Sequence, residues 1–160
     1  MEKELSASAQ RVQSALENSG LSLQVVELPA STRTAQEAAD AIGCQVGQII
    51  KSLVFKTTHT NRPVLILASG SNRVSESNLS EWIGEGLVKA DADFVRQQTG
   101  YAIGGVPPLA HNQDLQTWID EDLLGYETLW AAAGTPHAVF CLTPSELLSI
   151  SGGKVIKIIG

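Results

Sequence analysis

The sequence predicts a mixed α/β fold in which helices surround a mixed β-sheet, and three observations lead to this expectation. A length of 160 residues suits one domain with a single core. A hydrophobic fraction of 43% and a charged fraction of 18% are typical of a globular chain. Strand-like and helix-like segments follow one another without the regular rhythm of a doubly wound nucleotide-binding fold. The sequence has no repeat, low-complexity tract or Pro/Gly linker, so residues 1–160 are expected to form one domain.

The elements of the first half follow from apolar periodicity and from capping residues. Thr34 and Glu37 form a capping-box pattern that begins a helix, and Gly43 ends it. A polar, hairpin-like stretch that ends at Pro63 separates two β-rich runs. In chain order, we expect a helix over residues 3–19, a strand over 21–28, a helix over 34–42, a short helical turn over 46–50, and strands over 52–56 and 64–68.

The second half is predicted in the same way. Thr143 is suited to an N-cap and Pro144 to the first helical position, so a helix is expected to begin there. In chain order, we expect helices over 76–83 and 92–98, a short strand over 117–120, strands over 129–133 and 138–142, a helix over 144–150 and a last strand over 154–159.

The charged residues are distributed unevenly, although the net charge is −6. Residues 31–75 carry five positive and two negative side chains, whereas residues 76–127 carry two positive and ten negative ones. A long duplex-binding surface needs many clustered Lys and Arg side chains, so a DNA-binding function is not expected. Contact with one or two phosphates at the end of a strand is compatible with the basic segment.

Several other classes of function are not expected. Cys44 and Cys141 lack the spacing of metal ligands, so neither a metal site nor a disulfide framework is predicted. The charged N-terminus is unlike a signal peptide, and no apolar run is long enough to cross a membrane. We therefore expect a cytoplasmic protein with reduced cysteines, without a metal, a cofactor or a membrane partner.

Lys51 is the first residue whose position suggests chemistry. It lies at the entry to one of the most apolar runs of the chain, where an unpaired lysine is costly to bury. A lysine at a strand end beside a cavity would bind phosphate as a point charge. The alternative is a lysine whose ammonium simply reaches solvent from an edge strand, and the pattern alone favours this alternative.

Two further segments are candidates for a ligand site. The run 101–108 contains Gly104 and Gly105 followed by two prolines, and such a loop can direct backbone N–H groups at an oxyanion or a water. An ordinary Gly-Pro turn is the commoner explanation. The run 132–137 places His137 at the end of an expected strand, where it would contact substrate, transfer a proton or cap a turn. Cys141 lies mid-strand among apolar residues, so a Cys–His nucleophile is rejected.

The order and spacing of these features resemble the YbaK/prolyl-tRNA-synthetase-associated family of trans-acting editing domains. The resemblance runs from about Val25 to the C-terminus, beyond an N-terminal helix within residues 1–20. It rests on the runs 31–39, 50–54, 68–72 and 99–108 and on the strand end that contains Gly134. It implies a curved, barrel-like mixed sheet surrounded by helices, with a pocket at one end.

The resemblance also implies the activity and the residues that carry it. Members of this family hydrolyse the ester bond of mischarged aminoacyl-tRNA without a cofactor or metal, so the acceptor end of tRNA is the expected partner, with a synthetase as a further candidate. The family lysine falls on Lys51 and the Gly-x-x-x-Pro signature on Gly104 and Pro108. Lys51 and Gly104 are thus the expected catalytic residues. The expected substrate-binding residues are Thr34, Ser69, Gly70, Gly105, Pro108, Gly134 and His137.

The substrate is less specified than the reaction. Thr34 stands where some relatives carry an aromatic residue, and it is either a pocket residue, a helix cap or both. The run from Gly134 to His137 differs from that of cysteinyl-tRNA deacylases and is closer to subgroups that act on alanine or another small amino acid. Alanine, serine, threonine or cysteine is therefore the expected substrate. The competing hypothesis is a non-catalytic module that binds aminoacyl-tRNA or a nucleotide-like ligand in the same pocket.

Overall fold

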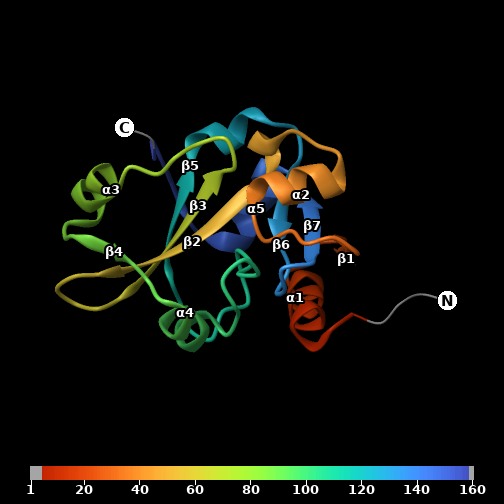
Figure 1. Ribbon diagram of the computed structural model, residues 1–160, viewed down its shortest axis with the longest axis horizontal. Coiled ribbons are helices and arrows are strands. Elements are labelled where there is room, and N and C mark those ends of the chain that lie inside the picture. Colours follow the sequence, from red (N-terminus) through yellow and green to blue (C-terminus); the bar gives the residue numbers. More distant parts are fainter. Residues whose placement is uncertain (1–4, 159–160) are drawn as a thin grey trace.

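The computed structural model describes residues 5–158 and contains two sheets and five α-helices in that range (Figure 1). The larger sheet has the strand order β4-β2-β3-β5-β8, and the smaller has the order β1-β7-β6. The strands are β1 (Val25–Glu27), β2 (Ile50–Thr57), β3 (Pro63–Ser69), β4 (Leu87–Lys89), β5 (Gln116–Asp120), β6 (Leu129–Ala132), β7 (Ala138–Leu142) and β8 (Lys154–Ile156).

The helices surround these two sheets, as the sequence predicts. They are α1 (Ala7–Asn18), α2 (Ala35–Ile42), α3 (Glu76–Ile83), α4 (Ala92–Thr99) and α5 (Pro144–Ser151), with short 3-10 helices η1 (Val46–Gln48) and η2 (Glu121–Gly125). Side-chain caps begin all five α-helices, with Ser6, Thr34, Ser75, Asp91 and Thr143 each accepting a hydrogen bond from a backbone N–H of the first turn. The expected helix starts near Thr34 and Thr143 are therefore confirmed.

The larger sheet is mixed and the smaller sheet is antiparallel. This pairing explains why strands and helices alternate irregularly along the sequence. β2 and β3 form the expected antiparallel hairpin, in which Lys51 lies opposite Ala68. β3, β5 and β8 are parallel neighbours, whereas the smaller sheet is antiparallel throughout. A single parallel bridge between Ile49 and Trp130 links the two sheets. The sheets do not close on one another, so the barrel-like description holds only loosely.

Several sequence expectations differ from the structure. The strand expected over 21–28 is confined to Val25–Glu27, because β1 pairs with β7 only over that length. β4 was not expected, because a three-residue edge strand with two exposed positions leaves no alternating pattern to recognise. The last strand, expected over 154–159, ends at Ile156, and residue 159 lies outside the described residues, as do residues 3 and 4 at the start of the first expected helix.

The core fills the space between the sheets and the helices. β3 is buried along nearly its whole length, with Val64, Leu65, Ile66, Leu67 and Ala68 inaccessible to solvent. One face of this central strand packs with α1 and the smaller sheet, and the other with α3 and β8. β2 lies between β3 and the short β4, and its pairing with the buried β3 holds the backbone of Lys51. Within residues 5–158, no helix is long and apolar enough to cross a membrane.

Candidate active site

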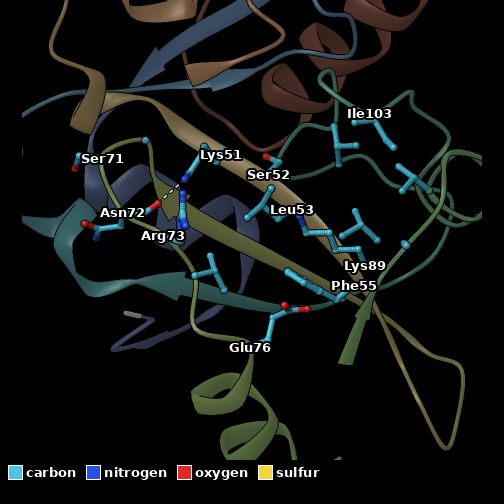
Figure 2. Close-up of a pocket in the computed structure, with 16 residues that line it drawn as sticks. Lys51, Ser52, Leu53, Phe55, Ser71, Asn72, Arg73, Glu76, Lys89 and Ile103 are labelled. Atoms are coloured by element: carbon cyan, nitrogen blue, oxygen red, sulfur yellow. Dashed lines mark hydrogen bonds between the residues drawn. The ribbon is translucent and has the colours of Figure 1, made fainter. Parts of the chain in front are cut away.

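Lys51 projects from β2 into a half-buried position beside the turn that follows β3 (Figure 2). Its ammonium donates a hydrogen bond to the backbone carbonyl of Asn72. Burial lowers the pKa of Lys51 from its usual 10.5, while the negative charge of Asp120 raises it and the positive charge of Arg73 lowers it. No carboxylate in the described part of the chain forms an ion pair with Lys51, so its charge is available to a ligand.

The turn 69–72 that receives Lys51 is held by the buried carboxylate of Asp120. One carboxylate oxygen accepts hydrogen bonds from the Ser69 backbone N–H at 2.9 Å and from the Asn72 side-chain amide at 2.8 Å. Asp122 accepts a second bond from that amide at 2.7 Å. The Gly70 N–H donates to the carbonyl of Ile49 at 2.7 Å, which ties the turn to the start of β2.

The loop that contains Gly104 lines a hollow that Lys51 also lines. Gly104 has a φ of 91°, a conformation that L side chains rarely adopt, and a Cβ there would lie 2.9 Å from Cγ of Arg33. The Gly105 N–H is already used, because it donates to the carbonyl of Ala102 at 3.0 Å. The Gly104 N–H has no hydrogen-bond acceptor among residues 5–158. Of these two amides, only that of Gly104 is free to donate to a ligand or a water.

Lys51 lies on a wall shared by two hollows. A small cavity of about 250 Å³ is lined mainly by apolar groups, including Ala38, Ile49 and Trp130. A wider basic groove of about 810 Å³ extends along β2 toward α3 and is lined by Lys51, Arg73 and Lys89 among others. The shared wall consists of Lys51, Ser52, Leu53, Ile103 and Val106. A ligand could place an apolar end in the small cavity and an anionic end in the basic groove. The bond between these two parts would then lie beside Lys51.

The structure brings some of the expected site residues together and leaves others outside. Lys51, Gly104 and Thr34 all line the small cavity, and Gly70 lines the basic groove. Thr34 is also the N-cap of α2, accepting a hydrogen bond from the Glu37 N–H at 3.1 Å, so it has both of the expected positions. Neither hollow is lined by the other expected substrate-binding residues, which are Ser69, Gly105, Pro108, Gly134 and His137.

The residues outside the two hollows support their walls. Ser69 is 1% exposed, and its hydroxyl donates to the carbonyl of Gly47 at 2.7 Å. The Gly134 N–H donates to the carbonyl of Gly105 at 2.9 Å, which joins the end of β6 to the 101–108 loop. A Cβ on Gly105 would lie 2.8 Å from the backbone of Thr135, so this approach requires a glycine. Pro108 is buried in the same loop.

His137 is exposed, and its ring nitrogen Nδ1 lies 3.2 Å from the carbonyl of Ala30. The backbone beside it is bonded to the same segment, since the Thr32 N–H donates to the carbonyl of Pro136 at 2.6 Å. The imidazole therefore touches the segment that leads to Thr32 and Thr34 rather than the cavity itself.

The two cysteines lack the environment of a nucleophile. Burial raises the pKa of the Cys141 thiol, although a hydrogen bond with Thr128 lowers it, and burial also raises the pKa of Cys44. A thiol with a raised pKa is protonated near neutral pH. The described part of the chain holds no group of three His, Cys, Asp or Glu side chains that would bind a metal ion.

Several residues of the two hollows are not predicted by the sequence. Arg73 directly follows the 68–72 run, and this position was the only signal that could have found it. Lys89 and Trp130 reach the hollows through strand pairing with β2 and through the bridge to Ile49. Such pairings join segments about 30 to 80 positions apart in the chain, so no local pattern predicts them.

Comparison with known proteins gives a consistent assignment. The model of the aminoacyl-tRNA editing domain family matches residues 29–150. A crystal structure named as a trans-editing enzyme for prolyl tRNA synthetase is 52% identical, with a TM-score of 0.92, over 98% of this chain and 99% of that one. The uncharacterized protein YwhH of Bacillus subtilis is 31% identical over 82% of this chain and 83% of its own length. EbsC of Enterococcus faecalis, named as a Cys-tRNA(Pro)/Cys-tRNA(Cys) deacylase, is 25% identical over 78% of this chain and 76% of its own.

The matched region includes Lys51, the turn 69–72 and the Gly104 loop, which form the site described above. It also includes both sheets except for β1 and β8, so most of the fold and the site are matched together. The chain belongs to the aminoacyl-tRNA editing domain family.

Proposed function

We propose that this aminoacyl-tRNA deacylase removes a small amino acid from the 3′ end of a mischarged tRNA. The observation that carries the proposal is the position of Lys51, whose unpaired ammonium lies where the small cavity and the basic groove meet. The small cavity would hold the aminoacyl group, and the terminal nucleotide would extend into the groove. This placement puts the ester bond beside Lys51.

The reaction needs a positioned water more than a strong base. Water adds to the ester carbonyl carbon, the bond to the ribose oxygen breaks, and that oxygen takes a proton to give free tRNA and the amino acid. The Lys51 ammonium would bind the terminal phosphate or the carbonyl oxygen, on which negative charge develops. The free N–H of Gly104 would orient the water or the oxyanion. A hydroxyl of the terminal ribose would assist the attack, because no carboxylate or imidazole is among the described residues that line the small cavity.

The dimensions of the small cavity favour alanine, serine, threonine or cysteine as the amino acid. Its volume of about 250 Å³ is below the range usual for drug-sized ligands. Thr32 and Ser52 on its wall have buried hydroxyl oxygens without a hydrogen-bond partner in the described part of the chain. A substrate group that reached either hydroxyl would satisfy it, which would favour a small polar side chain.

The supporting residues have defined places in this proposal. Thr34 would line the end of the cavity that holds the amino-acid side chain, while Ser69 and Gly70 would shape the turn that holds Lys51. Gly105, Pro108 and Gly134 would keep the Gly104 loop in place. His137 would influence specificity through the 30–34 segment. The partner would be the acceptor end of tRNA in the cytoplasm, and a synthetase would be a further partner that delivers it.

The direct test is a panel of tRNAs charged with alanine, serine, threonine, cysteine and, as a bulky control, phenylalanine. We expect the purified protein to release one or more of the small amino acids and to leave phenylalanine in place. A protein that binds these tRNAs but hydrolyses none would instead be a non-catalytic binding module. Faster hydrolysis of the phenylalanyl ester than of any small one would contradict the assignment of the cavity.

A further inference from the structure

The basic groove carries a local charge opposite to that of the whole protein. Among residues 5–158, three cationic side chains line it, those of Lys51, Arg73 and Lys89, and one carboxylate, that of Glu76. The net charge of the chain is −6. No ion pair neutralises these cations among residues 5–158, and the pKa of Lys51 is lowered in part by Arg73, so the two charges act on one another. A concave surface with several unpaired cations attracts an anionic ligand.

The shape of the groove fits an extended ligand rather than a single phosphate. Figure 2 shows Lys51 and Arg73 converging beside Asn72, while Lys89 lies farther along β2. Lys89 pairs with Phe55, four residues after Lys51 on β2, which corresponds to about 13 Å along a strand. The groove thus has one cationic centre at the inferred position of the ester and a second one well beyond it.

Apolar side chains line the same groove. Ile103 is 46% exposed and belongs to the wall that the groove shares with the small cavity. Leu53 and Val74 also line the groove. Proteins that bind single-stranded nucleic acid combine a cationic track for the backbone with flat or apolar surface for the bases.

We infer that the basic groove binds the single-stranded 3′ end of tRNA, with Arg73 and Lys89 contacting its backbone phosphates. This inference rests on the proposed function and adds the surface and the residues that recognise the RNA. The terminal ribose ester reaches Lys51 at the inner end of the groove, and the preceding nucleotides extend along β2 toward Lys89. Glu76 borders the groove at the start of α3 and opposes binding by its charge.

The test separates RNA contacts from chemistry by the use of two substrates. Alanyl-tRNA carries backbone phosphates, whereas an alanyl ester of adenosine carries none. Arg73→Gln and Lys89→Gln are expected to raise KM for alanyl-tRNA about two- to fivefold each, without changing kcat. Both variants should hydrolyse the adenosine ester as the parent does. Arg96→Gln, which removes an exposed cation of α4 outside both hollows, is the matched control and should change neither substrate.

Binding of a short single-stranded RNA that ends in CCA, measured by fluorescence anisotropy, provides a readout that does not depend on catalysis. The slope of log K against log salt should fall by about 0.7 for each phosphate contact that Arg73→Gln or Lys89→Gln removes. Glu76→Gln should tighten binding, because it removes the repelling charge, and an unchanged or weaker affinity would contradict the placement of the strand beside α3.

The failures of the two proposals are distinguishable. Hydrolysis by the parent, together with KM and salt slopes for Arg73→Gln and Lys89→Gln equal to those of Arg96→Gln, would overturn the groove while keeping the deacylase. An equal loss on alanyl-tRNA and on the adenosine ester would also overturn it, because the cations would then act at the ester. Specific RNA binding by a parent that hydrolyses neither ester would keep the groove and remove the proposed reaction.

Discussion

Asp120 accepts a hydrogen bond from the side-chain amide of Asn72 at 2.8 Å, and the backbone carbonyl of the same Asn72 accepts one from Lys51. Asp120 is 1% exposed and lies at the end of β5, two strands away from β2. A carboxylate at the end of one strand therefore holds the turn on which a lysine of another strand depends. The sequence alone predicts Asp120 only as the end of a short strand.

Asp120→Asn is expected to destabilise the turn 69–72 and to lower the pKa of Lys51. An asparagine would turn an NH₂ group toward the donors of Ser69 or Asn72, at a cost of about 1–3 kcal/mol in the free energy of unfolding. It would also remove a charge that raises the pKa of Lys51, so the alkaline limit of activity should move to lower pH. Thermal unfolding and a pH profile measure the two effects. Asp122→Asn, at an exposed partner of the same amide, is the control, and a loss of stability with an unmoved pH limit would make Asp120 purely structural.

Lys51→Ala is expected to lower the rate of deacylation about ten- to a hundredfold, because it removes a charge-assisted contact of about 1.5–3 kcal/mol. The stability should change little, since burial of the ammonium offsets the contribution of its one hydrogen bond. Single-turnover deacylation and thermal unfolding measure both quantities. Lys56→Ala is a matched control on the same strand, where the ammonium lies over the ring of Phe94 at 5.4 Å. Equal rates for the parent and Lys51→Ala would remove Lys51 from the mechanism.

The pH dependence should report the lowered pKa of Lys51. Activity that needs the charged lysine falls as the pH rises through its folded-state pKa, which lies below 10.5. Between that value and 10.5 the unfolded chain binds more protons at this site, so the stability contributed by Lys51 rises with pH in the same window. A profile of kcat/KM, corrected for spontaneous ester hydrolysis, measures the limit. Lys51→Arg should shift the limit upward, and an identical limit in both proteins would mean that another group titrates.

Gly104→Ala should cost stability and activity together. A φ of 91° is strained for alanine by about 1–2 kcal/mol, and the new Cβ would meet Cγ of Arg33 at 2.9 Å. Either the loop shifts and misplaces its free N–H, or Arg33 moves within the wall of the small cavity. The double variant Gly104→Ala with Arg33→Ala separates the causes, because it relieves the contact and keeps the strain. Because alanine keeps the backbone N–H, a folded and fully active Gly104→Ala protein would show that neither the strained φ nor the contact with Arg33 affects the site.

His137→Ala is expected to change the ranking of substrates more than the best rate. The ring contacts the Ala30 carbonyl at 3.2 Å, and its loss would loosen the segment that presents Thr32 and Thr34 to the small cavity. The measurement compares alanyl, seryl, threonyl and cysteinyl esters in the parent and the variant. A decrease by one common factor for all four esters would show that His137 supports the fold or the chemistry without selecting the amino acid.

The sequence predicted local features better than the contacts between distant segments. Caps such as Thr34 and Thr143 and strongly periodic elements such as α3 and β7 were predicted, because their signals lie within a few residues. Lys51 was recognised as unusual because a charge at the start of an apolar strand is costly. The carboxylate that supports its turn, the bridge from Ile49 to Trp130 and the cationic groove depend on pairing between distant segments. His137 illustrates the same limit, since its place at a strand end was predicted but the direction of its ring was not.

Gly134 joins the N-terminal helix to the site. A Cβ at Gly134 would lie 2.6 Å from the carbonyl oxygen of Ser8 on α1, and the Gly134 N–H holds the carbonyl of Gly105 in the loop beside Lys51. The family model begins at residue 29, after α1. A chain that began at that boundary would lack Ala9, Val12 and Leu16, and the core residues that they contact would become exposed. It would also lose one support of the loop. The smallest fragment that retains hydrolysis should therefore begin before Ser6, the cap of α1, and any fusion partner is better attached at the other end of the chain.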